Sequence, residues 1–244
     1  MKRLGLAIFL LVAGATAAYA QQLDLGAIGQ ADGATVGRII QMFGLLTILS
    51  VAPGLLIMVT SFTRFVIAFS ILRSGMGLQS TPANLVLISL SLFMTFYVMS
   101  PAVDQAWSTG VQPLMNNQIT QQVAVERISS PFRDFMARNV RDKDYDLFAD
   151  LARERGDTNL ARDTVDLRVL VPAFMISEIR RGFEIGFLIV LPFLVIDLIV
   201  ATITMAMGMM MLPPTVISLP FKIMFFVLID GWNLLVGSLV RSFN

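Results

Sequence analysis

Long stretches without charged side chains constrain this chain more than any other feature of its sequence. No Asp, Glu, Lys or Arg occurs in residues 39–63 or 85–103. Residues 185–221 and 223–240 contain one charged residue each, Asp197 and Asp230. About 20 apolar residues in a helix cross roughly 30 Å of hydrocarbon. We therefore predict an all-α membrane protein, with apolar helical segments in both halves of the chain.

Prolines and glycines divide these stretches into two hairpins. Pro53 beside Gly54 should kink the first segment. A Gly-rich turn at 74–77 should follow, and Thr81-Pro82 should start the helix of the second segment. The pair Pro213–Pro214 cannot continue a helix. We expect two long, kinked hydrophobic hairpins at 38–104 and 168–244. If all four segments span, both ends lie on the periplasmic side, but the turns hold too few Lys or Arg to support an orientation.

The middle of the chain has a different composition. Residues 105–167 carry about half of all charged side chains, whereas the whole chain is only 14% charged. Ser130–Pro131 is typical of a helix start, and Phe132, Phe135 and Met136 would share one face of that helix. A second helix is expected at 144–155, with Leu147, Phe148 and Leu151 on one face and Gly156 as its stop. We predict a small, soluble, helical periplasmic insert whose apolar stripes pack against partners, or alternatively a solvated linker.

The first residues have the pattern of a secretory signal peptide. Lys2 and Arg3 precede an apolar stretch, and Ala18-Tyr19-Ala20 forms a small-x-small cleavage site. We assign residues 1–20 to this peptide and 21–37 to a periplasmic lead-in. An uncleaved anchor helix is the alternative.

The residue types argue against catalysis. The chain has no Cys and no His, so thiolate nucleophiles, imidazole bases and the commonest transition-metal ligands are excluded. A Ser–Lys protease would pair Ser218 with Lys222, but Pro220 is expected to break the helix that would align them. No phosphate-binding G-x-x-x-x-G-K-[ST] motif occurs. With a net charge of +1, the chain is not expected to bind nucleic acid, and we expect no enzyme, cofactor or metal.

Charged residues also lie within or beside the apolar segments, where lipid exposure would cost a few kcal/mol each. They are Arg64, Glu178, Arg180, Arg181, Glu184, Asp197, Lys222 and Asp230. An ion-coupled transporter would gather such groups at one midplane site. Here they are scattered over every segment, which favours a subunit whose charges pair across helix or subunit interfaces. For Asp197, Lys222 and Asp230 we hypothesise buried pairing of this kind. Gly182 and Gly186 have the GxxxG spacing of closely packed helices.

Five methionines lie within seven residues before Pro213, at positions 205, 207, 209, 210 and 211. Methionine is flexible and polarizable, so it fills irregular gaps. The cluster is either ordinary apolar packing or a soft constriction at a hairpin tip, and several copies around an axis would then seal a pore. Copper binding is disfavoured because no His or Cys supports it.

Ordered motifs over most of the chain after residue 38 resemble the FliP/SctR family of type III secretion export-gate proteins. They are MVTSFTR at 58–64, MSP at 99–101, PFRDFM at 131–136, PFLVIDL at 192–198, AMGMMMLPP at 206–214, ISLP at 217–220, FK at 221–222 and VLIDGW at 227–232. The signal peptide resembles that of the flagellar branch more than the virulence branch.

The resemblance implies a helical ring of about five copies, joined by FliR and FliQ and working with FlhB and FlhA. Such a gate passes unfolded flagellar proteins across the bacterial inner membrane at the flagellar basal body, with its core raised toward the periplasm. It also implies that the hairpins pack mostly against neighbouring subunits rather than lipid. A virulence secretion subunit is the alternative within the family, and an ion-coupled transporter the alternative outside it.

Residue roles follow from the matching motifs. Met209, Met210 and Met211 match the family's methionine gasket around the closed pore. Phe135, Phe148 and Glu178 fall where the family makes subunit contacts. Together with the paired charges Arg64, Asp197, Lys222 and Asp230, these are the candidate site residues.

Overall fold

The computed structural model describes residues 57–156, 166–208 and 213–243, together with scattered positions between 37 and 54. The chain divides into two compact units, Met1–Pro53 and Gly54–Asn244. The first unit contains few described residues, so the fold below is that of the second. The predicted signal peptide, nearly all of the lead-in at 21–37 and Pro53 of the predicted kink lie outside the described residues.

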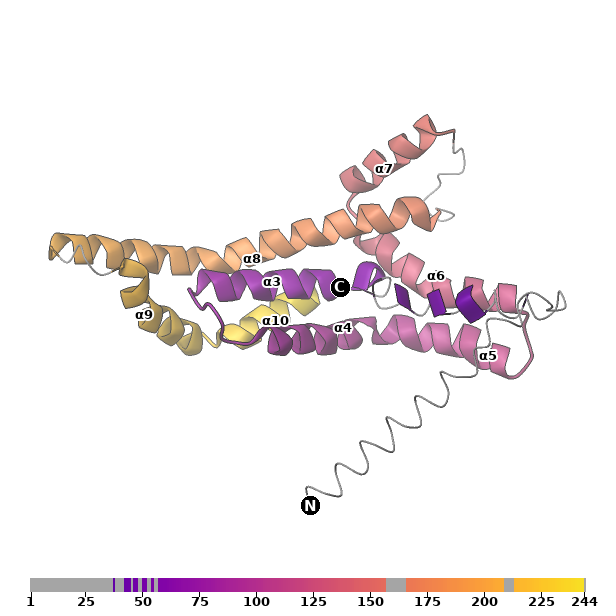
Figure 1. The fold of residues 1–244 in the computed structure, drawn as a ribbon, viewed down its shortest axis with the longest axis horizontal. Helices are drawn as coiled ribbons and strands as arrows, with labels where there is room; N and C mark the ends of the chain where they lie inside the picture. The colour runs from indigo at the N-terminus through magenta and orange to yellow at the C-terminus, as the bar shows by residue number, and fades with distance from the viewer. Residues whose placement is uncertain are drawn as a thin grey trace, which may run out of the picture. The chain divides into compact units, whose positions relative to one another are not determined.

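Every regular element that the structure describes is helical, as the sequence predicts (Figure 1). The elements are α3 (Phe62–Gly75), α4 (Asn84–Ala106), the π-helical turn η2 (Trp107–Val111), α5 (Gln112–Met115), α6 (Gln121–Asn139), α7 (Asp142–Glu154), α8 (Leu167–Ala206), α9 (Pro214–Leu228) and α10 (Gly231–Arg241).

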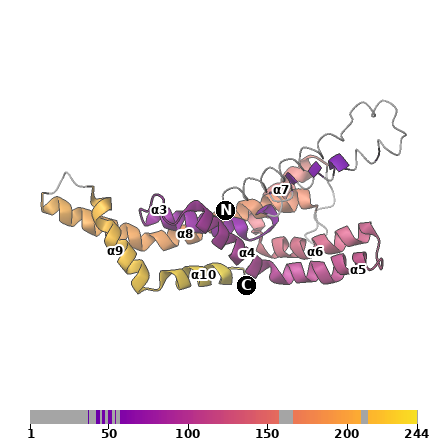
Figure 2. The same ribbon diagram turned by 60° about the horizontal axis from the view of Figure 1, so that its bottom comes forward.

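Two helical stretches in the described part of the chain are long and apolar enough to cross a membrane, Asn84–Met115 and Leu167–Ala206. The pair α9 and α10 would be a third if its 64° bend lies within one span. That bend, which both Figures 1 and 2 show, follows a single left-handed residue, Asp230 with φ of 52°. Residues 223–240, expected as one apolar segment, are thus divided between α9 and α10.

Helix α3 packs along α8 through a small-residue face on α8. A Cβ on Gly186 would lie 2.9 Å from the Cβ of Ile71, and one on Gly182 would lie 3.0 Å from the Cβ of Ile67. These distances leave no room for a side chain at either glycine. The close packing predicted from the spacing of Gly182 and Gly186 is thus confirmed, with α3 as the partner helix.

We expect Gly186→Val to force α3 away from α8 and to lower the free energy of unfolding by about 1–3 kcal/mol, the usual cost of overpacking a core. Gly237→Val is the matched control, because a Cβ at that helical glycine meets nothing within 4 Å. Unfolding of the chain in detergent by added SDS, followed by circular dichroism, measures both. Equal stability of the two variants would contradict the packing argument.

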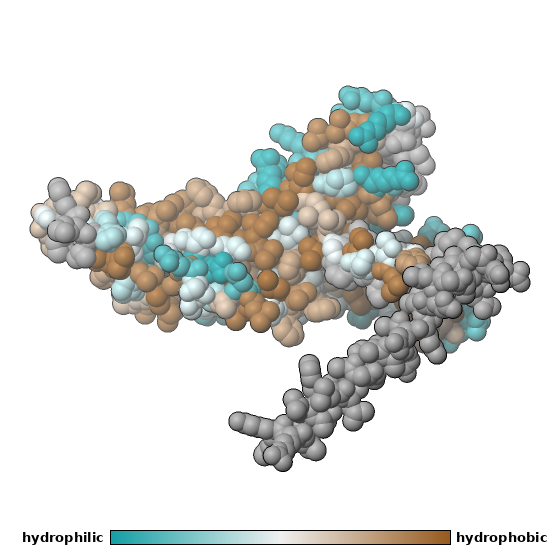
Figure 3. All heavy atoms as spheres, viewed as in Figure 1, coloured by the Kyte–Doolittle hydropathy of each residue, from teal (hydrophilic) through white to brown (hydrophobic). Residues whose placement is uncertain are grey.

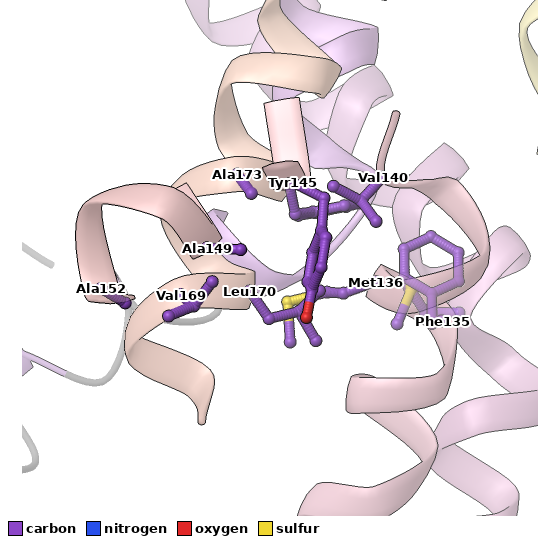
Figure 4. Packing of buried hydrophobic residues seen from close by; sticks show 11 residues of the cluster. Phe135, Met136, Val140, Tyr145, Ala149, Ala152, Val169, Leu170 and Ala173 are labelled. Carbon is purple, nitrogen blue, oxygen red and sulfur yellow. The ribbon is translucent and has the colours of Figure 1, made fainter. Parts of the chain in front are cut away.

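One hydrophobic core joins the insert to α8 (Figure 4). Its buried residues come from α4, α6, α7, α8 and the α6–α7 turn, and include Phe135, Met136, Tyr145, Leu170 and Phe174. A second core joins α3, α4, α8, α9 and α10, and includes Phe65, Phe69, Leu87, Phe193 and Phe226. The shared face predicted for Phe132, Phe135 and Met136 is confirmed, since all three pack in the first core.

Two predicted helix boundaries are wrong. Ser130 and Pro131 lie inside α6 rather than at its start, and Pro131 is buried. Packing of α6 against α4 and α8 outweighs the backbone hydrogen bond that a proline removes. Pro82 does not begin a helix, because α4 starts two residues later, at Asn84.

The chain passes from the first predicted hairpin into the insert without a break in the helix, whereas a new helix begins where the insert was predicted to end. Residue 104, where the first hairpin was predicted to end, lies inside α4, and the helix continues through η2 to Met115. At the other edge, α8 begins at Leu167. The stop at Gly156 is confirmed, with φ of 91° directly after α7.

Candidate functional site

Arg64 on α3 and Glu178 on α8 form an ion pair that is closed to solvent, with no exposed surface on either side chain. Arg64 Nε donates a hydrogen bond of 2.9 Å to Glu178 Oε2, and Nη2 donates to Oε1. This two-pronged geometry is the strongest that arginine makes with a carboxylate. The pair therefore fixes both the register and the rotation of α3 against α8.

The residues after α10 complete the surroundings of Arg64. Its Nη1 donates to the carbonyl oxygen of Ser242 at 2.9 Å and to the hydroxyl at 2.7 Å. The guanidinium carbon lies 3.5 Å from the centre of the Phe243 ring, a cation–π contact. Phe243 in turn contacts Phe65 and Phe135. Arg64 thus connects α3, α8, α6 and the segment after α10.

A second charged group joins α8 and α9 to the end of α3. Lys222 Nζ donates hydrogen bonds of 2.6 Å to Asp197 Oδ2 and 3.1 Å to the carbonyl oxygen of Gly75. The other oxygen of Asp197 accepts a hydrogen bond from Ser218. Only 3% of the Lys222 side chain is exposed, against 27% for Asp197. Asp197 and Lys222 are therefore paired within the chain.

The predicted effect of Pro220 is wrong. Helix α9 continues through Pro220, so Ser218 and Lys222 do lie on one face, and both donate to Asp197. A lysine that serves as a general base must give up its proton. Lys222 instead uses its protons on Asp197 and Gly75, which is the arrangement of a structural ion pair.

A third polar contact attaches the start of α7 to α8. Ser177 Oγ donates a hydrogen bond of 2.7 Å to Asp144, and the backbone N–H of Arg141 donates to Ser177 Oγ at 3.1 Å. Arg141 also lies 3.9 Å from Glu184, which pairs with Arg180 on the surface of α8. No motif in the sequence indicates this contact between Ser177 and Asp144.

Phe135 and Phe148, predicted at a subunit contact, both pack in the first core of this chain. Only 7% of Phe135 is exposed, so it can affect a neighbouring subunit only through the position of α6. On α7, Leu147 and Leu151 stay exposed while Phe148 turns toward the core. Contacts of Phe135, Phe148 and Glu178 with another subunit stay a prediction.

Asp230 lies exposed at the bend between α9 and α10. Its carbonyl oxygen accepts hydrogen bonds from the backbone of Asn233 and Leu234. Within the described residues it forms no ion pair, in contrast to Asp197 and Lys222. A pairing of Asp230 across a subunit interface stays a prediction.

The methionine gasket residues Met209, Met210 and Met211 lie outside the described residues. Their flanks are described: α8 ends at Ala206, Gly208 has φ of 75°, and α9 begins at Pro214. The break between the two helices that the sequence predicts at Pro213–Pro214 is confirmed. Met205 and Met207 are exposed before it.

Large apolar side chains are exposed along the same helices that enclose the charges. On the face shown in Figure 3, hydrophobic residues cover much of α8, whereas hydrophilic residues gather around α7. Residues more than half exposed include Phe183, Phe187, Leu188, Val195, Leu198 and Ile203 on α8, and Phe93, Phe96 and Tyr97 on α4. A chain that pairs its charges inside and exposes its apolar residues is built for lipid or for other apolar subunits. Among the described residues, no group of three or more carboxylates is placed to hold a metal ion.

Known proteins are similar to this chain over most of its length. The model of the FliP family matches residues 45–239. The chain is 75% identical over 215 residues to the flagellar biosynthetic protein FliP of Agrobacterium fabrum, covering 88% of each chain. It is 72% identical to that of Rhizobium meliloti, covering 87% of this chain and 86% of the relative. It is 46% identical to that of Bacillus subtilis, covering 87% and 95%.

Proposed function

This chain belongs to the FliP family, and we propose that it is a pore-forming subunit of the flagellar type III protein export gate. Its similarity to these relatives identifies the chain as a component of flagellar biosynthesis and export, and its apolar helices indicate that it is located in a membrane. Within that role, we assign to it the passage of unfolded flagellar proteins across the bacterial inner membrane. The relatives named above are all flagellar proteins, which favours the flagellar system over a virulence system.

The observation that carries the proposal is the division between buried charges and exposed apolar faces. Arg64, Glu178 and Lys222 are enclosed within the chain, whereas α4, α8 and α9 carry most of the exposed large apolar residues. An ion-coupled transporter would need its charged groups accessible to the transported solute. A pore subunit needs the opposite, because its apolar faces join neighbouring copies.

The proposed assembly contains about five copies of this chain in a helical ring, joined by FliQ and FliR. FlhB and FlhA would act with it, and the core would stand toward the periplasm at the flagellar basal body. The proposal assigns no chemical reaction to the chain. The loop that carries Met209, Met210 and Met211 lies between α8 and α9, and in such a ring one copy of it per subunit would converge on the axis and seal it.

We expect the chain co-expressed with FliQ and FliR to be purified as one complex, which native mass spectrometry would resolve into about five copies plus partners. Replacing Met209, Met210 and Met211 by Ala should leave that complex intact and raise its ion conductance in planar bilayers at least about tenfold, because three flexible side chains that fill the constriction are shortened.

The matched control changes three exposed methionines elsewhere, Met58, Met115 and Met224, to Ala. It should conduct no more than the wild-type complex. A single-copy particle, or equal conductance for both triple variants, would overturn the proposed pore.

A further inference from the structure

We propose that the cavity between α4, α6, α8 and the segment after α10 binds the phosphate headgroup of an anionic phospholipid. The cavity has a volume of about 670 Å³. The residues that line it include Tyr97, Ser100, Arg138, Asn139, Arg181 and Phe243. The proposal goes beyond the export function and rests only on a membrane location for the chain.

The charge of the cavity points to an anion. Arg138 and Arg181 both line it, and none of the described residues that line it is acidic. Arg181 forms no hydrogen bond or ion pair with a described residue, and among the described residues Arg138 donates only to the backbone carbonyl of Asp134, at 3.2 Å. The buried pair Arg64–Glu178 nearby is already neutral. Neither guanidinium group therefore forms an ion pair with a described carboxylate, and arginine binds phosphate oxygens in the same two-pronged way as carboxylates.

The position of the cavity matches the depth of a lipid headgroup. On α8, five charged residues lie in 167–184, whereas 185–206 contains only Asp197, so Arg181 marks the change from polar to apolar helix. On α4 the apolar stretch leads up to Tyr97 and Ser100, and Leu87 near its start lies in the same hydrophobic core as Phe193 of α8, beyond Arg181. Both apolar stretches thus extend from the cavity in the same direction. The polar insert, represented by Arg138 and Asn139, lies on its other side.

Aromatic residues supply the second half of a lipid site. Tyr97 is 68% exposed, and Phe93 and Phe96, within one turn of it toward the apolar end of α4, are 70% and 67% exposed. Tyrosine is common at the level of lipid headgroups, and the two phenylalanines offer an apolar path for acyl chains. Basic pockets between transmembrane helices are a known way of binding such headgroups. An anionic phospholipid would contact the arginines with its headgroup and the phenylalanines with its acyl chains, whereas free phosphate would contact only the arginines.

The test is native mass spectrometry of the full-length chain, stripped of lipid in detergent and titrated with dioleoyl phosphatidylglycerol or dioleoyl phosphatidylcholine. The two lipids share their acyl chains and differ in net charge. We expect the wild-type chain to bind the anionic lipid at least about tenfold more tightly, and R138Q/R181Q to lose that preference. The control R127Q/R168Q removes the same charge from two exposed arginines that do not line the cavity, and should keep the preference.

Three results would overturn the proposal. The first is equal binding of the two lipids by the wild-type chain, which needs no variant and so holds even if R138Q/R181Q folds poorly. The second is loss of the preference on addition of inorganic phosphate alone, which would assign the cavity to a free anion. The third is a lipid preference that R138Q/R181Q keeps while its self-assembly falls, which would assign the cavity to a carboxylate of a second copy of the chain.

Discussion

Glu178→Ala is expected to lower the free energy of unfolding by about 3–5 kcal/mol, the usual cost of leaving one partner of a buried ion pair without the other. The variant leaves the Arg64 guanidinium enclosed, with only the Ser242 acceptors and the Phe243 ring around it. In the intact pair none of the Arg64 side chain is exposed. Unfolding by SDS in detergent micelles, followed by circular dichroism, gives the change.

The matched control is Glu184→Ala, on the same helix. Glu184 pairs with Arg180, and both side chains are more than half exposed, so its loss should cost less than about 1 kcal/mol. The double variant R64M/E178L removes both charges and keeps the volume apolar, and should recover most of the stability lost in the single variant. A Glu178→Ala variant as stable as Glu184→Ala would contradict the buried pair.

Much of the fold follows from local sequence signals. The charge-poor stretches predict α4 and the second half of α8, the glycines at 75 and 77 predict the turn after α3, and Pro213–Pro214 predicts the start of α9. Such signals act over a few residues and so can be read one segment at a time. The bend at Asp230 also has a local sequence signal, because Asp-Gly is a common turn dipeptide. The apolar residues on both sides, at 223–240, nevertheless favoured the prediction of one continuous segment.

The site depended on information that no local pattern carries. The need to pair Arg64, Asp197 and Lys222 follows from the cost of charge in an apolar setting, but the choice of partner depends on how each helix is rotated about its axis. Arg64 and Glu178 are separated by 114 residues, and Arg64 and Ser242 by 178. Ser242 and Phe243 had no signal of their own. The prediction that a helix starts at Pro131 is wrong because the packing of α6 against α4 and α8 outweighs the local preference of proline for the first turn of a helix.

Lys222→Met is expected to cost about 2–3 kcal/mol in the free energy of unfolding, less than Glu178→Ala because Asp197 keeps some access to solvent. The variant removes the only described cation bound to Asp197 and also the donor to the carbonyl of Gly75. Helix α9 thus loses its ion pair with α8 and this polar contact with α3, and keeps the hydrogen bond from Ser218 to Asp197. Ser218→Ala, which removes one neutral donor to Asp197 and leaves the ion pair in place, should cost about 1 kcal/mol. An equal loss in the two variants would show that the charge of Lys222 adds nothing.

The same pair also separates the export gate from a transporter. Asp197→Asn keeps the shape of the side chain and its contact with Ser218 but removes the charge that Lys222 binds. If Asp197 is a structural partner in an assembly subunit, the yield of the complex with FliQ and FliR should fall while the conductance of each assembled particle stays unchanged. If Asp197 bound a transported ion, the complex would form normally and transport would be lost. Since Ser218 and Gly75 complete the hydrogen bonding of the pair from inside the chain, we expect the first outcome.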